Sequence, residues 1–131
     1  MYYLDTNTCI YFLKGIYPEL LIRLKSHAPN DIKISAIVKA ELLLGVEKSV
    51  KRDENMAKIE AFLLPFEIVQ FGDEDSSHYA SIRASLEAKG TPIGPNDLFI
   101  AATVKKNNGI LITNNIREFS RVEGLRLENW T

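Results

Sequence analysis

The sequence predicts an α/β fold in which a central parallel sheet of about five strands is flanked by helices. Segments with helical and with strand-like patterning alternate along almost the whole chain. Short runs such as 110–112 are apolar at every position, which is typical of parallel strands buried on both faces. With 131 residues, 46% of them hydrophobic and 25% charged, the chain is expected to form one domain over residues 1–131.

The first strand and helix are predicted around Asp5. Residues 2–4 favour a strand and give way abruptly to polar side chains. Residues 8–14 then read as a helix, with Thr6 or Asn7 as its cap and Gly15 just past its end. A strand that stops at Asp5 places this carboxylate at the carboxyl edge of the sheet, where open α/β folds bind ligands.

The remaining elements follow from periodicity and from helix-breaking residues. Before Gly90 we expect a helix over 18–24, a strand over 32–34, a helix over 36–50 capped by Ser35, a helix over 53–64, a strand over 66–71 and a helix starting at Asp73 or Asp75. After a loop at 90–95 we expect a helix over 97–106 capped by Asn96, a strand over 110–113, a turn at 116–119 and a last strand near 125–127.

Two acidic residues lie in apolar surroundings. Glu41 has Ile37, Val38 and Leu44 as helical neighbours, and a lone ionised carboxylate beside an apolar face is costly. A cation shared with other acids would explain this position, and a structural hydrogen bond is the alternative. Asp97 lies in the first turn of its helix, where attraction to the helix dipole is an equally good explanation.

Together these acids predict a metal site. Asp5 and Asn115 follow strands, Asp97 begins a helix and Glu41 projects from another, so a parallel sheet can bring all four into one cleft. Oxygen ligands without His or Cys select Mg²⁺ or Mn²⁺. Such a cation positions water, lowers its pKa and neutralises charge on a phosphodiester. We therefore expect Asp5, Glu41, Asp97 and Asn115 to be catalytic, the three acids among them binding the metal.

Other chemistries have little support. The single cysteine, Cys9, excludes an internal disulfide and reads as a core side chain in a reducing compartment. His27 and His78 lie apart in polar settings, so no zinc site is expected, and no glycine-rich phosphate loop occurs. No apolar run approaches the roughly 20 residues of a membrane span, and no secretion signal is evident, so we expect a cytoplasmic protein.

Four motifs, in order, resemble the PIN-domain ribonucleases and, more narrowly, the VapC toxins of bacterial type II (VapBC) toxin–antitoxin systems. They are residues 3–7, 40–42, 94–102 and 113–119, and the likeness extends from residue 2 to residue 130. The resemblance implies endonucleolytic cleavage of RNA with Mg²⁺ or Mn²⁺, and inhibition of translation. By position, Asp5, Glu41 and Asp97 match the family's three central acids.

The fourth family position departs from the common pattern. It is acidic in many relatives, whereas this chain has Asn115, whose neutral amide leaves open whether one or two metal ions bind. Glu118 is a nearby carboxylate that would add to the site. Thr6, Asn7 and Thr113 match positions that usually support the site by hydrogen bonds.

The resemblance also implies a substrate and partners. Residues 89–95 and 124–130 are similar to the VapC subgroup that cleaves initiator tRNA in its anticodon loop. The family further implies a homodimer and a cognate VapB antitoxin whose C-terminal segment occupies the active-site groove. The formal net charge is −1, so RNA binding would need a local basic rim. The candidates are Lys33, Lys39, Lys48, Lys51, Arg52, Lys105, Lys106, Arg117 and Arg121, although most of these are expected on solvated helix faces.

Two alternatives stay open. The first is a small phosphatase with Asp5 as nucleophile, but such enzymes usually carry a second acid two residues on, where this chain has Asn7. The second is a PIN-like module that binds RNA or protein without cleaving it, which Asn115 would permit.

Overall fold

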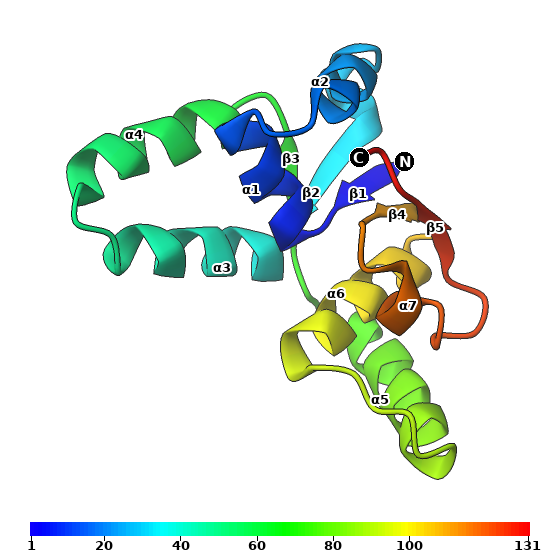
Figure 1. Ribbon diagram of the computed structural model, residues 1–131. Coiled ribbons are helices and arrows are strands. Elements are labelled where there is room, and N and C mark those ends of the chain that lie inside the picture. Colours follow the sequence, from blue (N-terminus) through cyan, green and yellow to red (C-terminus); the bar gives the residue numbers. More distant parts are fainter.

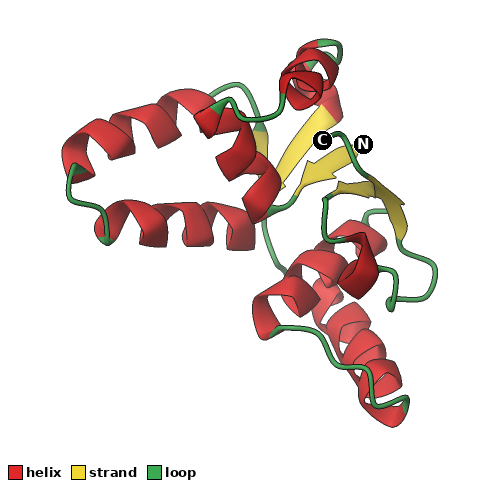
Figure 2. Cartoon of the chain, in the orientation of Figure 1, coloured by secondary structure: helices red, strands yellow, loops and turns green.

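The computed structural model describes all residues from Met1 to Thr131 and contains a five-stranded, all-parallel sheet flanked by helices (Figures 1 and 2). The elements are, in chain order, β1 (Tyr2–Leu4), α1 (Thr6–Lys14), α2 (Pro18–Lys25), β2 (Ile32–Ser35), α3 (Ala36–Glu47), α4 (Arg52–Leu63), β3 (Glu67–Val69), α5 (Asp73–Ala88), α6 (Pro95–Lys106), β4 (Ile110–Ile112), α7 (Ile116–Phe119) and β5 (Arg126–Glu128). A single 3₁₀ turn, Pro29–Asp31, precedes β2. The predicted parallel α/β architecture is confirmed.

The strand order places the ends of β1 and β4 side by side. The order is β3-β2-β1-β4-β5, so the chain builds outward in one direction to β3 and then crosses over to β4. Leu4 pairs with Ile112, and the backbone N–H of Asp5 donates to the Ile112 carbonyl over 3.1 Å. Ligands bind at the carboxyl ends of strands where the strand order reverses. Asp5 and Thr113 therefore meet at the place where this topology favours a site.

The core lies on both faces of the sheet. Leu4, Ile34 and Ile112 of the three inner strands are almost completely buried. Helices α1, α3 and α4 lie on one side of the sheet, and α5 and α6 lie on the other (Figure 1). Ala101 and Ala102 on α6 are fully buried, and their small side chains allow this helix to pack closely. This burial on both faces explains why β4, one of the inner strands, is apolar at every position.

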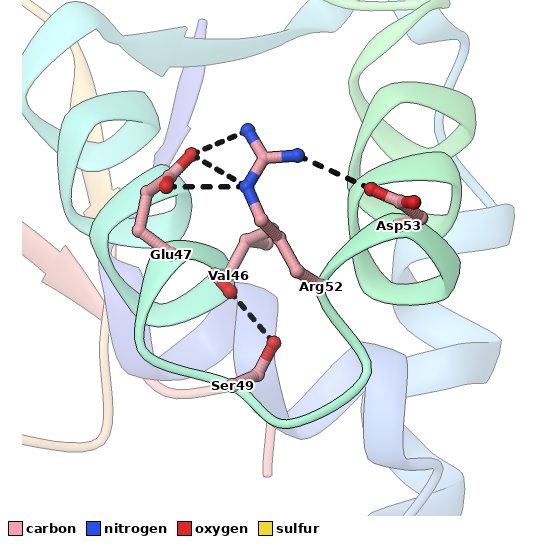
Figure 3. A network of polar contacts seen from close by, with 5 residues as sticks. All are labelled: Val46, Glu47, Ser49, Arg52 and Asp53. Carbon is pink, nitrogen blue, oxygen red and sulfur yellow. Dashed lines mark hydrogen bonds and ion pairs between the residues drawn. The ribbon is translucent and has the colours of Figure 1, made fainter.

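Helices α3 and α4 form an antiparallel hairpin closed by polar contacts (Figure 3). Ser49 Oγ donates to the Val46 carbonyl over 2.6 Å, and Arg52 forks onto Glu47 with its shortest N···O distance at 2.7 Å. Arg52 also reaches Asp53 at 3.3 Å. Exposed pairs of this kind add little stability, so their main effect is to fix the turn. The turn ends α3 at Glu47, three residues before the predicted end at Val50.

Two predicted helix caps are wrong. Helix α1 begins at Thr6 and is capped by Asp5, where Thr6 or Asn7 was expected. Helix α6 begins at Pro95 with Gly94 at the cap position, where Asn96 was expected. Proline is favoured at the first helical position because its fixed φ suits the helix and its missing N–H is not needed there.

Strand β3 and the surroundings of His27 also differ from expectation. Strand β3 spans Glu67–Val69, shorter than the predicted 66–71, because three residues pair with β2. His27 was expected in a polar setting, but its ring stacks on Trp130 at 5.0 Å and 7° and lies 4.5 Å from the ring of Tyr2. These contacts hold the two ends of the chain together.

Cys9 is buried as predicted, and burial raises the pKa of its thiol.

No helix of the fold combines the length and the apolar character that spanning a membrane requires.

Candidate active site

Asp5 is a buried carboxylate held by donors from two directions. Its side chain is 5% exposed. The Thr8 backbone N–H donates to Oδ1 over 2.8 Å, and Thr113 Oγ1 donates to Oδ2 over 2.5 Å. Burial raises the pKa of the Asp5 carboxyl, those hydrogen bonds oppose the rise, and the charge of Glu41 adds to it. Asp5 therefore has a fixed orientation at the end of β1.

Thr113 links the ends of the two central strands. Its hydroxyl donates to Asp5 and accepts the backbone N–H of Asn115 over 2.9 Å. On the other side of Asp5, Thr8 Oγ1 donates to the Ile112 carbonyl over 3.1 Å. Both threonines are buried, so each contact is shielded from water. The polar residues after β1 and β4 thus form one connected unit.

Glu41 joins three helices. It projects from α3, and Thr6 Oγ1 at the start of α1 donates to its Oε1 over 2.5 Å. Asn96 Nδ2 in the first turn of α6 donates to its Oε2 over 3.2 Å. Both donors are neutral, so they hold the Glu41 carboxylate without cancelling its charge.

Asp97 shows that the acids share one region. Burial raises the pKa of its carboxyl to about 6, and the charges of Glu41, Glu118 and Asp5 contribute in that order. It lies in the first turn of α6, where the helix dipole alone would favour the ionised form. Crowding with other carboxylates and removal from water therefore outweigh the dipole.

Asn115 and Glu118 lie at the start of α7 and within it. With Glu118, the acids Asp5, Glu41 and Asp97 form what we call the acidic edge. Asn115 precedes the helix, and its Nδ2 donates to Glu118 Oε2 over 3.1 Å. This contact turns the amide nitrogen towards Glu118 and leaves the amide oxygen Oδ1 available as a ligand or acceptor. The chain thus brings a carboxylate to the acidic edge one helical turn beyond the residue that matches the family's fourth position.

The donor chemistry of this edge fits a hard divalent cation, because it offers carboxylate, hydroxyl and amide oxygens and neither thiolate nor imidazole. In this structure no group of three or more His, Cys, Asp or Glu side chains forms a complete ligand set. The oxygens of Glu41 and Asp5 are satisfied by hydroxyl, amide and backbone donors. The acids therefore lie near one another without forming a ligand cluster, and neutral donors bind the oxygens of Asp5 and Glu41.

A groove of about 450 Å³ opens beside Glu41, between α1, α3 and α4. Its walls are largely apolar, with Ile10, Leu42 and Ile59 contributed by the three helices in turn. Lys14 and Lys58 also line the groove and are exposed. Because Glu41 belongs both to the groove and to the acidic edge, a molecule that fills the groove contacts one of the acids.

The structure places the predicted residues unequally. Seven of them meet at the carboxyl edge, namely Asp5, Glu41, Asp97, Asn115, Glu118, Thr6 and Thr113. Asn7 is exposed and makes no side-chain hydrogen bond within the chain.

Sequence reasoning missed two residues that hold the acids. The position of Thr8, three residues after Asp5, is the spacing of a helix-capping contact and could have indicated its role. Asn96 was read only as a cap, and no local pattern indicates its bond to Glu41, 55 residues away.

A parallel sheet whose strand order reverses between β1 and β4, with acids gathered at that edge, agrees with the PIN-domain class. The PIN domain family model matches residues 2–125, and the chain belongs to this family. Within the family its relatives are VapC proteins. It is 43% identical over 134 residues to the ribonuclease VapC2 of Rickettsia felis, covering 99% of this chain and 98% of the relative. It is 39% identical over 127 residues to the tRNA(fMet)-specific endonuclease VapC of Salmonella typhimurium, covering 97% and 96%.

A solved structure agrees with this placement. The crystal structure of VapBC2 from Rickettsia felis bound to a DNA fragment from their promoter contains a chain that matches with a TM-score of 0.94. The match has 43% sequence identity and covers 99% of this chain and 98% of that one. The predicted membership of the VapC group of PIN-domain ribonucleases is confirmed.

Proposed function

We propose that the chain is a metal-dependent endoribonuclease toxin of a VapBC system, with residues 1–131 forming one PIN domain. The observation that carries the proposal is the convergence of Asp5, Glu41, Asp97 and Glu118 at the switch point of the sheet. Thr113 holds Asp5, Thr6 and Asn96 hold Glu41, and Asn115 holds Glu118. The charges of the other three acids also help to raise the pKa of Asp97. A cation bound among carboxylates that repel one another cancels this repulsion, which favours its binding. The VapC relatives supply RNA as the expected substrate class.

Asp5, Glu41 and Asp97 would hold the cation, Mg²⁺ or Mn²⁺, with Asn115 contributing its amide oxygen. When bound there, such a cation supplies charge neutralisation on the phosphodiester and a lower pKa for an attacking water. Thr8 and Thr113 fix the two oxygens of Asp5, so this ligand is oriented in advance. In the metal-free chain the pKa of the Asp97 carboxyl is about 6, and a bound cation would favour its ionised form and lower this pKa.

Glu118 is proposed to supply the fourth carboxylate of the site. Its charge acts on Asp97, and Asn115 donates to it from the position where many relatives have an acid. In this arrangement the amide of Asn115 orients Glu118. The carboxylate that the family pattern has at position 115 is then supplied by position 118.

Fewer of the predicted cations are free to contact RNA than the sequence suggested. Most of them form an ion pair or donate to a backbone carbonyl within the chain. For example, Lys33 pairs with Glu67 at 3.1 Å and Lys106 pairs with Asp75 at 3.8 Å. Arg117 is exposed and lies in the same short helix as Glu118. It is therefore the best placed of the predicted cations to meet a phosphate beside the acids. A tRNA substrate, as the name of the Salmonella relative suggests, would present a splayed loop to this edge.

The proposed partner is a VapB antitoxin, since related chains are solved as VapBC complexes. The groove beside Glu41 suits an apolar segment, and a basic side chain on that segment would pair with the acids. By resemblance to VapC toxins we also propose a homodimer, inhibition of translation and a cytoplasmic location. The residue two positions after Asp5 is Asn7 and not an acid, which argues against the use of Asp5 as a phosphatase nucleophile.

The test is cleavage of bulk tRNA by the purified chain with Mg²⁺ or Mn²⁺, followed by sequencing of the new ends. Discrete fragments are expected, and they should disappear with EDTA and in Asp5→Ala and Asp97→Asn. Asp73→Asn is the matched control, because Asp73 is an exposed acid in the first turn of α5. Equal cleavage by Asp97→Asn or in EDTA would contradict the proposed site, and metal-independent RNA binding without cleavage would favour a non-catalytic module.

A further inference from the structure

Asn96 makes a long-range contact that its exposed position does not suggest. Helix α6 begins at Pro95, which sets Asn96 in the first turn directly before Asp97. From there its Nδ2 donates to Oε2 of Glu41 on α3 over 3.2 Å. Its side chain caps no helix and makes no other hydrogen bond, so the contact with Glu41 is what distinguishes this position.

The contact completes the hold on Glu41. Thr6 occupies Oε1 and Asn96 occupies Oε2, so the two oxygens are fixed by neutral donors on different helices. Asn96 directly precedes Asp97, so the contact brings the Glu41 carboxylate to the start of the helix that carries Asp97, and the two like charges repel each other. Without the amide, Glu41 would be held at one oxygen only and would be free to turn away from Asp97 into the adjoining groove.

We propose that Asn96 is a positioning residue whose amide keeps the Glu41 carboxylate at the acidic edge and thereby raises the affinity of the site for a divalent cation. The part that concerns the cation rests on the function proposed above. The contact between Asn96 and Glu41 does not depend on it.

The residue type matters at this position. In the first turn of a helix an aspartate would be favoured by the dipole and is nearly the same size. A carboxylate accepts hydrogen bonds but cannot donate one to Glu41, and it would add a further negative charge. If position 96 were only a surface position, loss of the amide would leave the stability unchanged. Repulsion by Glu41 and Asp97 would also disfavour Asn96→Asp, so N96A, which removes the donor without adding charge, is measured beside it in the same cycle.

A double-mutant cycle without metal separates the two readings. Unfolding midpoints are measured in EDTA at pH 7.5 for the wild type, N96A, N96D, E41Q and the double variants. N96D should lower the midpoint by a few degrees with Glu41 in place. With E41Q it should be neutral or stabilising, because the new amide can donate to the new carboxylate. Asn30→Asp is the control, since Asn30 is exposed and lies before β2, at the opposite edge of the sheet. Additive effects of N96D and E41Q would overturn the proposal.

A second measurement tests the consequence for the cation. Mn²⁺ titration, followed by the electron paramagnetic resonance signal of free Mn²⁺, compares the wild type with N96A and N30A. Mutation of residues that orient metal ligands typically lowers metal affinity by about 10- to 100-fold. N96A should therefore bind Mn²⁺ at least about tenfold more weakly than the wild type. Unchanged affinity of N96A would overturn the positioning role. If the wild type bound no Mn²⁺, the metal-dependent function would fail, and the metal-free cycle would still decide whether Asn96 positions Glu41.

Discussion

Asp97 makes the acidic edge sensitive to pH. In the folded chain the pKa of its carboxyl is raised from 3.8 to about 6 by burial and by Glu41, Glu118 and Asp5. A raised carboxyl pKa means that the folded state binds the proton more tightly than the unfolded state does. Ionisation of Asp97 therefore costs stability, and this cost grows as the pH rises from about 4 to above 6.

We expect Asp97→Asn to stabilise the metal-free protein at pH 7.5 and to have no stabilising effect at pH 4. The gain at pH 7.5 should be about 1 to 2 kcal/mol, because a partly exposed group realises less than the full effect of its pKa change. Urea unfolding in EDTA at both pH values measures it. Asp73→Asn serves as control for the helix dipole and should bring no gain at either pH. An equal effect of Asp97→Asn at both pH values would show that Asp97 is not crowded by other acids.

The candidate site could be predicted from the sequence only where a local pattern carries the information. Asp5 ends an apolar strand and Glu41 lies beside apolar helical neighbours, so both are visible in a short window of residues. The bonds from Thr6 and Asn96 to Glu41 span 35 and 55 residues. They depend on how three helices meet, and no periodicity in the sequence encodes that meeting.

At the scale of elements, the turn between α6 and β4 depends on a close approach. A Cβ added at Gly109 would lie 2.5 Å from Cε1 of the Tyr3 ring and 3.3 Å from the Met1 carbonyl. Tyr3 is 4% exposed on β1, so its ring has little room to move. Gly109 thus allows β4 to pair with β1 and to deliver Thr113 to Asp5.

Gly109→Ala is expected to destabilise the fold by about 1 to 3 kcal/mol, the usual cost of overpacking a core. Gly45→Ala is the contrasting variant, because Gly45 lies within α3 with nothing within 4 Å of an added Cβ. It should stabilise the chain by about 0.5 to 1 kcal/mol through helix propensity. Urea denaturation of both variants gives the comparison. A neutral Gly109→Ala would mean that the Tyr3 ring yields readily and that the turn does not need glycine.

Element types and order were predictable, while several boundaries were not. Alternating apolar and polar stretches define strands and helices within a window of residues, and all five strands were found in this way. The predicted start of α6 is wrong because proline, which marks loops, is also favoured at the first position of a helix, where Pro95 lies. The end of α3 was misplaced because Arg52 and Ser49 close a hairpin whose geometry depends on α4.

At the scale of the molecule, the acidic edge and the groove are parts of one surface. The strand order brings Asp5 and Asn115 together, and the hairpin of α3 and α4 stands beside them on the α1 side of the sheet (Figure 1). Glu41 lies where the two parts meet. A segment bound along the groove contacts Glu41 and would cover the other acids if it extends past this residue. We therefore expect binding of the partner to reduce RNA cleavage.

Filling the groove should weaken the binding of the antitoxin and, to the same extent, its inhibition of RNA cleavage. Gly45 lines the groove on α3, so Gly45→Leu places an apolar side chain there at a position where helix propensity favours the change. The Kd for the cognate antitoxin, measured by calorimetry, should rise at least about tenfold, which corresponds to about 1.4 kcal/mol. Val50→Leu is the matched control, because Val50 is fully exposed in the turn after α3 and does not line the groove. In RNA cleavage assays, Gly45→Leu should need proportionally more antitoxin for half-inhibition. Equal affinities of the two variants would place the antitoxin elsewhere. Weaker binding with unchanged inhibition would show that the groove adds affinity while another contact blocks the acids.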